Sequence, residues 1–333
     1  HTMARENKSL AENLFERIPF WQKNPSVFCE EMLGIKLPSH QRNIIDSLIK
    51  YDKISVRSSN SIGKSFIASA LIIWFFFCYL WSEDENDSVI VVFTAPVFNQ
   101  VRDNIFANIK EHFDRANKIM KKKYGEHVNF APRISENQNL AEVRWGNKNY
   151  IQGVSGAKEN TVVGKHATYV LLVYDEAQGV PEKIYSDFNG IALSGQKVRQ
   201  IMIGNTTLPD GKTGKFYESF GKNSTYHQIK ITAFDTPNFI ETGITLEDYF
   251  REETDHDYWR KKLDRYCRTS YRMAVKNNTI PDWKEQTALR LPDKYLINPN
   301  EVFNILYENG MNPDSYEVQT RVLAEFPSED SAS

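Results

Sequence analysis

Short apolar runs alternate along this chain with longer segments in which apolar residues recur at helical spacing. The apolar runs predict strands over 54–57, 88–94, 169–174, 200–203 and 226–232. The longer segments predict helices over 11–34, 41–50, 66–81 and 98–123. The run from Val89 to Phe93 is continuous, as expected of a strand that is covered on both faces. Strands that alternate with helices predict an α/β fold with a mostly parallel sheet wrapped by helices.

Residues 66–81 carry no charged side chain over sixteen positions, so a membrane span has to be considered. A helix that crosses a bilayer needs about twenty apolar residues. The segment is shorter than that, and it follows Lys64 and Ser65 directly. Both features favour a helix that is buried on all sides against the sheet.

Three further segments have patterns of their own. Residues 142–153 alternate around a Gly146-Asn147 turn, which predicts a hairpin. Residues 155–166 contain Gly, Ser, Asn and Lys without periodicity and predict a mobile loop. Residues 246–310 are charged and aromatic, and we expect them to form a helical lid or subdomain.

Composition narrows the class of protein. The 333 residues are 41% hydrophobic and 25% charged, which is typical of a folded globular protein. The net charge of −2 argues against a dedicated nucleic-acid coat, so any contact with DNA would come from a local patch or from the geometry of an oligomer. Cys29, Cys78 and Cys267 lie far apart, which argues against a disulfide framework or a zinc site and fits a reducing cytosol.

Candidate chemistry begins with a phosphate-binding loop that lacks its first glycine. The pattern G-x-x-x-x-G-K-[ST] fits residues 58–65 except that Ser58 stands in place of the glycine. The backbone N–H groups of such a loop and the start of the following helix bind phosphates, while the lysine neutralises charge and the serine hydroxyl holds Mg²⁺. The candidate nucleotide-binding residues are Ser58, Ser59, Asn60, Ser61, Ile62, Gly63, Lys64 and Ser65.

An acidic pair follows the predicted strand 169–174. Parallel sheets bind ligands at the carboxyl ends of their strands, where Asp175 and Glu176 are expected to lie. An aspartate there can hold Mg²⁺, and a glutamate can polarise the attacking water. The alternative is that two acidic residues simply end a strand.

Two polar positions are candidates for sensing the nucleotide. The amide of Gln41 can pair with an adenine edge, and the alternative is a solvated helix glutamine. Asn205 and Thr206 follow strand 200–203, where a polar side chain can sense the γ-phosphate. Gly204-Asn205 is also ordinary turn chemistry, so a plain turn is the alternative.

A cation must stabilise the charge of the transferring phosphoryl group. The two catalytic candidates are Arg57, just before the loop, and Lys165, ten residues before Asp175. Arg57 could instead cap a strand end, Lys165 could be solvated charge, and a neighbouring subunit could supply the cation. The lysines at 118 and 121–123 favour a solvated helix end over a DNA contact.

Taken in order, these motifs resemble the N-terminal DNA-packaging ATPase domain of the large terminase subunit of tailed bacteriophages. The matching stretches are loose one by one, but their order is specific. They are Gln41 with 55–65, 91–105, 162–180, 202–220, 231–238 and 321–327. The resemblance implies a P-loop NTPase of the additional-strand catalytic glutamate type, with a mostly parallel sheet and a small helical lid.

The resemblance also assigns roles to single residues. It implies that Asp175 and Ser65 hold the metal, Glu176 is the catalytic glutamate, and Gln41 belongs to an adenine-sensing motif. It implies that Asn205 and Thr206 belong to a coupling motif. Many relatives place an arginine inside the loop where this chain has Asn60, so Arg57 or Lys165 is expected to take over that role.

In function, the resemblance implies a motor that hydrolyses ATP with Mg²⁺ and moves double-stranded viral DNA into a procapsid. The implied partners are the portal protein, the small terminase subunit and further copies in a ring, in the cytoplasm of the host bacterium and away from any membrane. One alternative is a superfamily 2-like DNA helicase or translocase core. Another is a nucleotide-binding scaffold without catalysis, which the intact loop and acidic pair disfavour.

We expect the chain to divide into four segments. Residues 1–3 are interpreted as a cloning remnant with the start methionine, and 4–238 as the P-loop ATPase core. Residues 239–320 are expected to form the helical lid, and 321–333 to begin a linker to a nuclease domain. We expect that nuclease domain, and its activity, to be absent from this chain, because no carboxylate trio lies on an evident strand in 246–333.

Overall fold

The computed structural model describes residues 2–156, 166–207, 214–242, 245, 247–248, 297 and 299–328. Within them, eight strands form one sheet. The strands are β1 (Lys53–Ser58), β2 (Val89–Thr94), β3 (Arg133–Asn137), β4 (Leu140–Trp145), β5 (Asn149–Val154), β6 (Ala167–Asp175), β7 (Gly195–Gly204) and β8 (His227–Ile231). Their order across the sheet is β3-β4-β5-β2-β6-β7-β1-β8.

Neighbouring strands from β5 across to β8 are parallel, and the antiparallel pairs are β3 with β4 and β4 with β5. Six carboxyl ends therefore meet at one edge. Strand β7 lies between β1 and β6, because β1 pairs with β7 and β7 pairs with β6. This extra strand separates the strand before the loop from the strand before the acidic pair, which is the arrangement that the resemblance implies.

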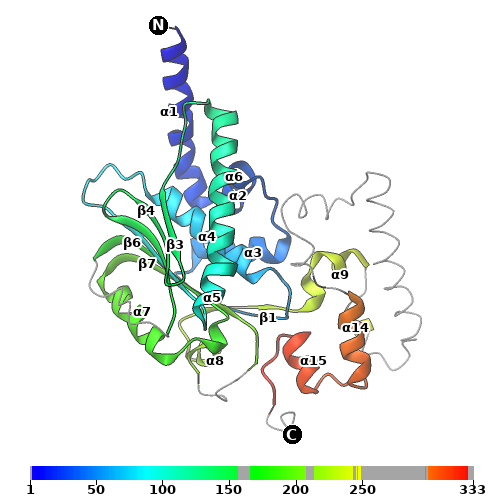
Figure 1. Ribbon diagram of the computed structural model, residues 1–333. Coiled ribbons are helices and arrows are strands. Elements are labelled where there is room, and N and C mark those ends of the chain that lie inside the picture. Colours follow the sequence, from blue (N-terminus) through cyan, green and yellow to red (C-terminus); the bar gives the residue numbers. More distant parts are fainter. Residues whose placement is uncertain are drawn as a thin grey trace.

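Helices cover both faces of the sheet (Figure 1). On one face lie α1 (Thr2–Lys23), α2 (Pro25–Leu33), α3 (Ser39–Lys50), α4 (Lys64–Tyr79) and α6 (Ala107–Tyr124). On the other lie α7 (Glu182–Ser194) and α8 (Lys215–Glu218). Strand β2 shows why both faces need cover, because Val91 faces the first cluster of buried side chains and Val92 faces the second.

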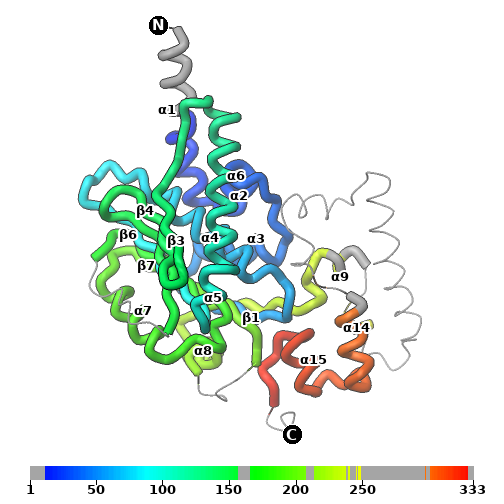
Figure 2. The backbone as a smooth tube through the Cα atoms, in the orientation of Figure 1, coloured from blue at the N-terminus to red at the C-terminus, as the bar shows by residue number. Residues whose placement is uncertain are grey.

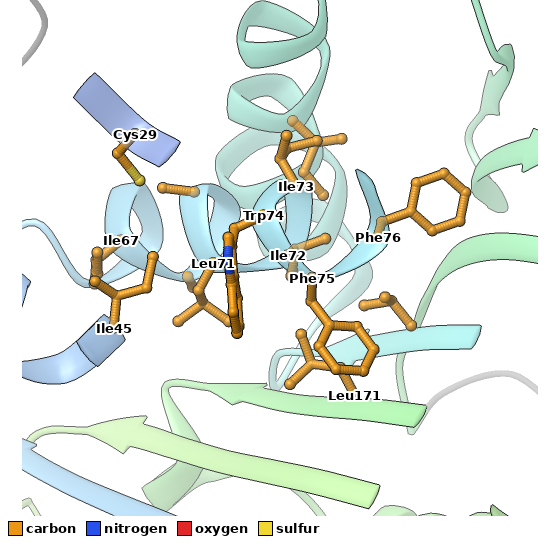
Figure 3. Packing of buried hydrophobic residues seen from close by; sticks show 14 of the residues in the cluster. Cys29, Ile45, Ile67, Leu71, Ile72, Ile73, Trp74, Phe75, Phe76 and Leu171 are labelled. Carbon is orange, nitrogen blue, oxygen red and sulfur yellow. The ribbon is translucent and has the colours of Figure 1, made fainter. Parts of the chain in front are cut away.

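Helix α4 is the centre of the larger cluster, as predicted for the uncharged segment. Its side chains from Phe66 to Cys78 are all buried. Leu71, Trp74 and Phe75 point toward the strands (Figure 3), while other residues of the helix meet its helical neighbours. None of the helices in the described part of the chain combines the length and the apolar character that a membrane span requires.

A third, smaller cluster lies beside the β1–β8 side of the sheet (Figure 2). It is built from η3 (Ala233–Asp235), α9 (Pro237–Thr242), α14 (Pro299–Glu308) and α15 (Tyr316–Arg321). Phe239, Phe303, Leu306 and Val318 form its interior. The Ala233 N–H donates to Val322 O over 2.9 Å, so the segment after α15 returns to the end of β8.

Several predicted elements differ in detail. The predicted helix 11–34 is wrong as a single helix, because it breaks at Asn24 and Pro25 begins α2, where its missing N–H costs no hydrogen bond. The predicted helix 98–123 exists but contains a π-helical turn, η1 (Val101–Phe106), between α5 (Phe98–Gln100) and α6. The hairpin is confirmed as β4 and β5. Most of the loop predicted over 155–166 and of the lid over 246–310 lies outside the described residues.

Candidate functional site

The loop at 58–65 joins β1 to α4, and its residues with positive φ lie near its C-terminal end. Ser58 closes the strand and does not have a positive φ, so the backbone does not require glycine there. The left-handed region is occupied by Ser61, with φ 57°, and by Gly63, with φ 81°. Glycine adopts that region freely, whereas serine does so under strain. The geometry therefore needs its glycine at 63 and tolerates a serine at 58.

Lys64 and Ser65 meet the acidic pair across the end of β7. The Ser65 hydroxyl donates to Asp175 Oδ2 over 2.7 Å. Lys64 Nζ lies 3.8 Å from Glu176 Oε1. The four predicted residues therefore lie together, with the acidic pair in contact with the end of the loop and the start of α4.

Asp175 is buried and only half satisfied by hydrogen bonds. Its side chain is 1% exposed, and Oδ1 has no hydrogen-bond partner among the described residues. Burial raises the pKa of this carboxyl, and the charge of Glu176 raises it further, while the Ser65 hydrogen bond and Lys64 act in the opposite direction. A carboxylate held this way in a dry site gains from a cation that could reach its free oxygen.

Gln178 is a site residue that the sequence reasoning missed. It lies in η2 (Ala177–Gly179), the turn that follows Glu176. Its Nε2 donates to Glu176 Oε2 over 2.7 Å, and its Oε1 accepts from the Asn205 N–H over 3.2 Å. The only signal in the sequence was a polar residue two positions after the glutamate.

Asn205 and Thr206 lie at the end of β7, beside the acidic pair. Asn205 Oδ1 accepts from the Thr207 N–H over 3.1 Å, which is a local turn contact. Thr206 is fully buried, and its Oγ1 has no hydrogen-bond partner among the described residues. The turn alternative is thus right for the backbone, while Asn205 also contacts Gln178 through its N–H.

Gln41 lies beneath the loop, not on a solvated face. Its side chain is fully buried, so the solvated alternative is wrong. Nε2 donates to Ile62 O over 3.1 Å, and Oε1 has no partner within the described residues. His40, which the sequence reasoning missed, places Nε2 2.9 Å from the same carbonyl. The pKa of His40 is lowered, mainly by burial. Two side chains of α3 therefore fix the loop at Ile62.

Of the two candidate catalytic cations, Arg57 and Lys165, the structure describes Arg57. The Arg57 guanidinium lies 5.4 Å from the ring centre of Phe220, which follows α8, and 5.5 Å from that of Phe326, in the segment 322–328 after α15. Its NH2 group also lies 3.5 Å from Glu325 Oε2. Lys165 lies outside the described residues.

A comparison with known proteins finds a relative of this chain in sequence. No protein-family model matches the chain. A probable large terminase subunit of Enterobacteria phage P7 is 27% identical over 245 residues, which make up 71% of this chain and 44% of that protein. The chain thus spans less than half the length of this relative.

The solved structure of one large terminase shares the architecture. The large terminase of bacteriophage HK97 matches with a TM-score of 0.50 and 11% identity, over 91% of this chain and 54% of that one. A mutant ATPase domain of the Thermus phage P74-26 large terminase gives a TM-score of 0.47 and 15% identity, over 81% of this chain and 100% of that one. The resemblance to the large terminase subunit that the motifs predict is therefore confirmed in sequence, and the fold is shared with the HK97 large terminase.

Proposed function

We propose that this chain is the ATPase motor domain of a phage large terminase subunit, which hydrolyses ATP to move double-stranded DNA into a procapsid. One observation carries the proposal: the loop residues Lys64 and Ser65 contact Glu176 and Asp175, which come from a different strand. A sheet edge that brings such a loop and such an acidic pair together is built to bind and cleave a nucleoside triphosphate.

The loop and the start of α4 would bind the phosphates. Gly63 precedes the first turn of α4, whose unpaired N–H groups and dipole favour an anion. Lys64 is 9% exposed, so its ammonium is shielded from water and acts strongly on a nearby phosphate. In our proposal it moves from Glu176 to the phosphates when ATP binds.

The residues present fit a divalent cation. The free Oδ1 of buried Asp175 and the adjacent Ser65 hydroxyl are oxygen ligands of the type that Mg²⁺ prefers. We propose that Ser65 and Asp175 hold Mg²⁺, which when bound supplies positive charge to the phosphates. In that state Ser65 would exchange its contact with Asp175 for the metal.

Glu176 would orient and polarise the attacking water. Its side chain is 29% exposed, so water can reach it. Departure of Lys64 to the phosphates would free Oε1 to accept a proton from that water. Asn205 and Thr206 would sense the γ-phosphate from the adjacent strand end. Gln41 would accept from the adenine amino group through its unpartnered Oε1.

A transition-state cation completes the proposed reaction. Arg57 is engaged by Glu325 and two aromatic rings, so it would have to leave them to reach a phosphate. Lys165 is the other candidate in this chain, and a neighbouring copy in a ring is a further source. We propose the portal protein, the small terminase subunit and double-stranded DNA as partners, in the cytoplasm of the host.

Steady-state ATP hydrolysis with and without Mg²⁺ tests the proposal. We expect Mg²⁺-dependent turnover that Glu176→Gln reduces by at least about a hundredfold while an ATP analogue still binds. Lys64→Ala is expected to lose binding as well as turnover. Glu182→Gln is the matched control, since this carboxylate is 73% exposed and lies at the start of α7. Wild-type turnover in Glu176→Gln would overturn the assignment.

A further inference from the structure

Gln178 joins two parts of the site that come from different strands. Its amide nitrogen holds Glu176, and its amide oxygen holds the backbone of Asn205. We propose that Gln178 is a positioning residue that fixes the catalytic glutamate and ties its orientation to the end of β7. This inference rests on the proposed ATPase function. It adds a residue that links the hydrolysing group to the strand end proposed to sense the γ-phosphate.

The backbone around Gln178 is shaped to admit this contact. A Cβ atom at Gly204 would lie 2.4 Å from Gln178 Oε1, and 3.1 Å from the Ala177 nitrogen. Real Cβ atoms essentially never approach other atoms within 3.0 Å, so any other residue at 204 would push the glutamine side chain away. The φ of Gly204 is not positive, so the lack of a side chain, and not a special conformation, is what this position requires.

Glu176 needs an external partner because its own backbone is strained. Its φ of 49° lies in the left-handed region, which costs a non-glycine residue of order 1–3 kcal/mol. Such a conformation persists only where the surroundings hold it. Among the described residues, the Glu176 carboxylate is held by Lys64 and Gln178. When Lys64 moves to the phosphates, Gln178 keeps the carboxylate in place.

The Gln178 side-chain amide also couples movement of the end of β7 to Glu176. Asn205 donates its N–H to Gln178 Oε1, so a shift of the strand end would pull the glutamine and then the glutamate. A shift of about 1 Å breaks a hydrogen bond of 3.2 Å, because such bonds weaken steeply with distance. Loss of the γ-phosphate at the end of β7 would therefore release Glu176, and turnover would depend on an intact bridge.

The test measures kcat and KM for ATP, and the affinity for an ATP analogue, on the full chain. Gln178→Met keeps the length of the side chain and removes both hydrogen bonds. We expect kcat to fall by about 10–100-fold, while KM and analogue affinity stay within about threefold. Gln178→Glu keeps an acceptor for Asn205 but sets a carboxylate against Glu176, and kcat should fall at least as far. Gln228→Met, an exposed glutamine on β8, is the matched control and should behave as the wild type.

Gly204→Ala tests the same bridge, the two hydrogen bonds that Gln178 makes to Glu176 and Asn205, by displacing the Gln178 side chain. It displaces Gln178 without changing its chemistry, so it should lower kcat like Gln178→Met. The double variant should be no more than about twofold worse than the lower single variant, since residues that act as one unit are not additive. Thermal unfolding checks that each variant is folded, and Gln178→Glu serves as the second reading if Gly204→Ala is not.

The outcomes separate the inference from the function on which it rests. A folded Gln178→Met variant with kcat within about twofold of an active wild type would overturn the bridge and leave the ATPase proposal intact. A rise in KM without a fall in kcat would also overturn it, because that result indicates a role in binding. Wild-type protein without Mg²⁺-dependent turnover would overturn the proposed function, and this inference with it.

Discussion

Protonation of the buried His112 is expected to destabilise the molecule in mild acid. The side chain lies on α6 and is 1% exposed. Its Nε2 lies 3.0 Å from the Ser69 hydroxyl of α4, and its ring meets Phe66 edge-on. Burial, reinforced by the nearby charge of Arg115, lowers the pKa of His112 from 6.5 to about 3.

The direction of the effect follows from where the proton binds. The folded protein keeps this imidazole neutral down to about pH 3, whereas the unfolded chain protonates it below about pH 6.5. Its contribution to stability is complete above pH 6.5 and is lost as the pH falls from 6.5 toward 3. With these pKa values, a change from pH 8 to pH 5 lowers the free energy of unfolding by about 2 kcal/mol through His112.

Urea unfolding at pH 8 and pH 5 measures this contribution when wild type and His112→Gln are compared. Glutamine keeps a polar contact with Ser69 and does not titrate. The wild type should lose about 2 kcal/mol more stability between the two pH values than the variant does. His127→Gln, which removes an exposed histidine, should leave the wild-type pH dependence unchanged. Equal pH dependence in wild type and His112→Gln would refute the reasoning.

Three more predictions concern packing and the segment after α15. Trp74→Ala should lower the free energy of unfolding by about 3–5 kcal/mol, because the indole is fully buried. Leu193→Ala, at an 89% exposed position, should change it by less than about 0.5 kcal/mol. Comparable losses in the two variants would contradict the burial argument. A double-mutant cycle of Arg57→Ala and Glu325→Ala should give a coupling of about 0.2–1 kcal/mol in urea unfolding, and a coupling of zero would mean that the pair adds no stability. Gly153→Ala should lower the free energy of urea unfolding by about 1–3 kcal/mol, since the new Cβ would lie 2.4 Å from a methyl group of Val101 in η1. An unchanged unfolding midpoint would show that η1 can move away from β5.

The fold was predictable where burial leaves a clear pattern. Strand β2 is buried at every position, and its continuous apolar run identified it. Strand β7 was predicted only over 200–203, because its first half is polar and half-exposed and pairs with β6 through its backbone. Strand β3 was missed for the same reason, since four of its five residues are exposed and carry no alternation.

The site residues that could be predicted are those identified by local sequence, and the one that was missed depends on contacts between distant segments. Lys64, Ser65, Asp175 and Glu176 could be predicted, because each lies at the end of a recognisable strand or at the start of a helix. The role of Gln178 could not, because it depends on β7 lying beside β6 and on the absence of a side chain at 204. Spacing along the chain holds no information about contacts that only the order of strands creates.

The place of Arg57 narrows the choice of catalytic cation. Two ring contacts and one ion pair hold its guanidinium against Phe220, Phe326 and Glu325. At about 0.5–1 kcal/mol for each ring and 0.2–1 kcal/mol for the ion pair, releasing it would cost about 1–3 kcal/mol. That cost lowers the population of a released arginine by roughly ten- to a hundredfold. A released arginine is therefore a minor species, which disfavours Arg57 as the transition-state cation. Arg57 is then better suited to fastening the segment after α15 to the strand that precedes the loop.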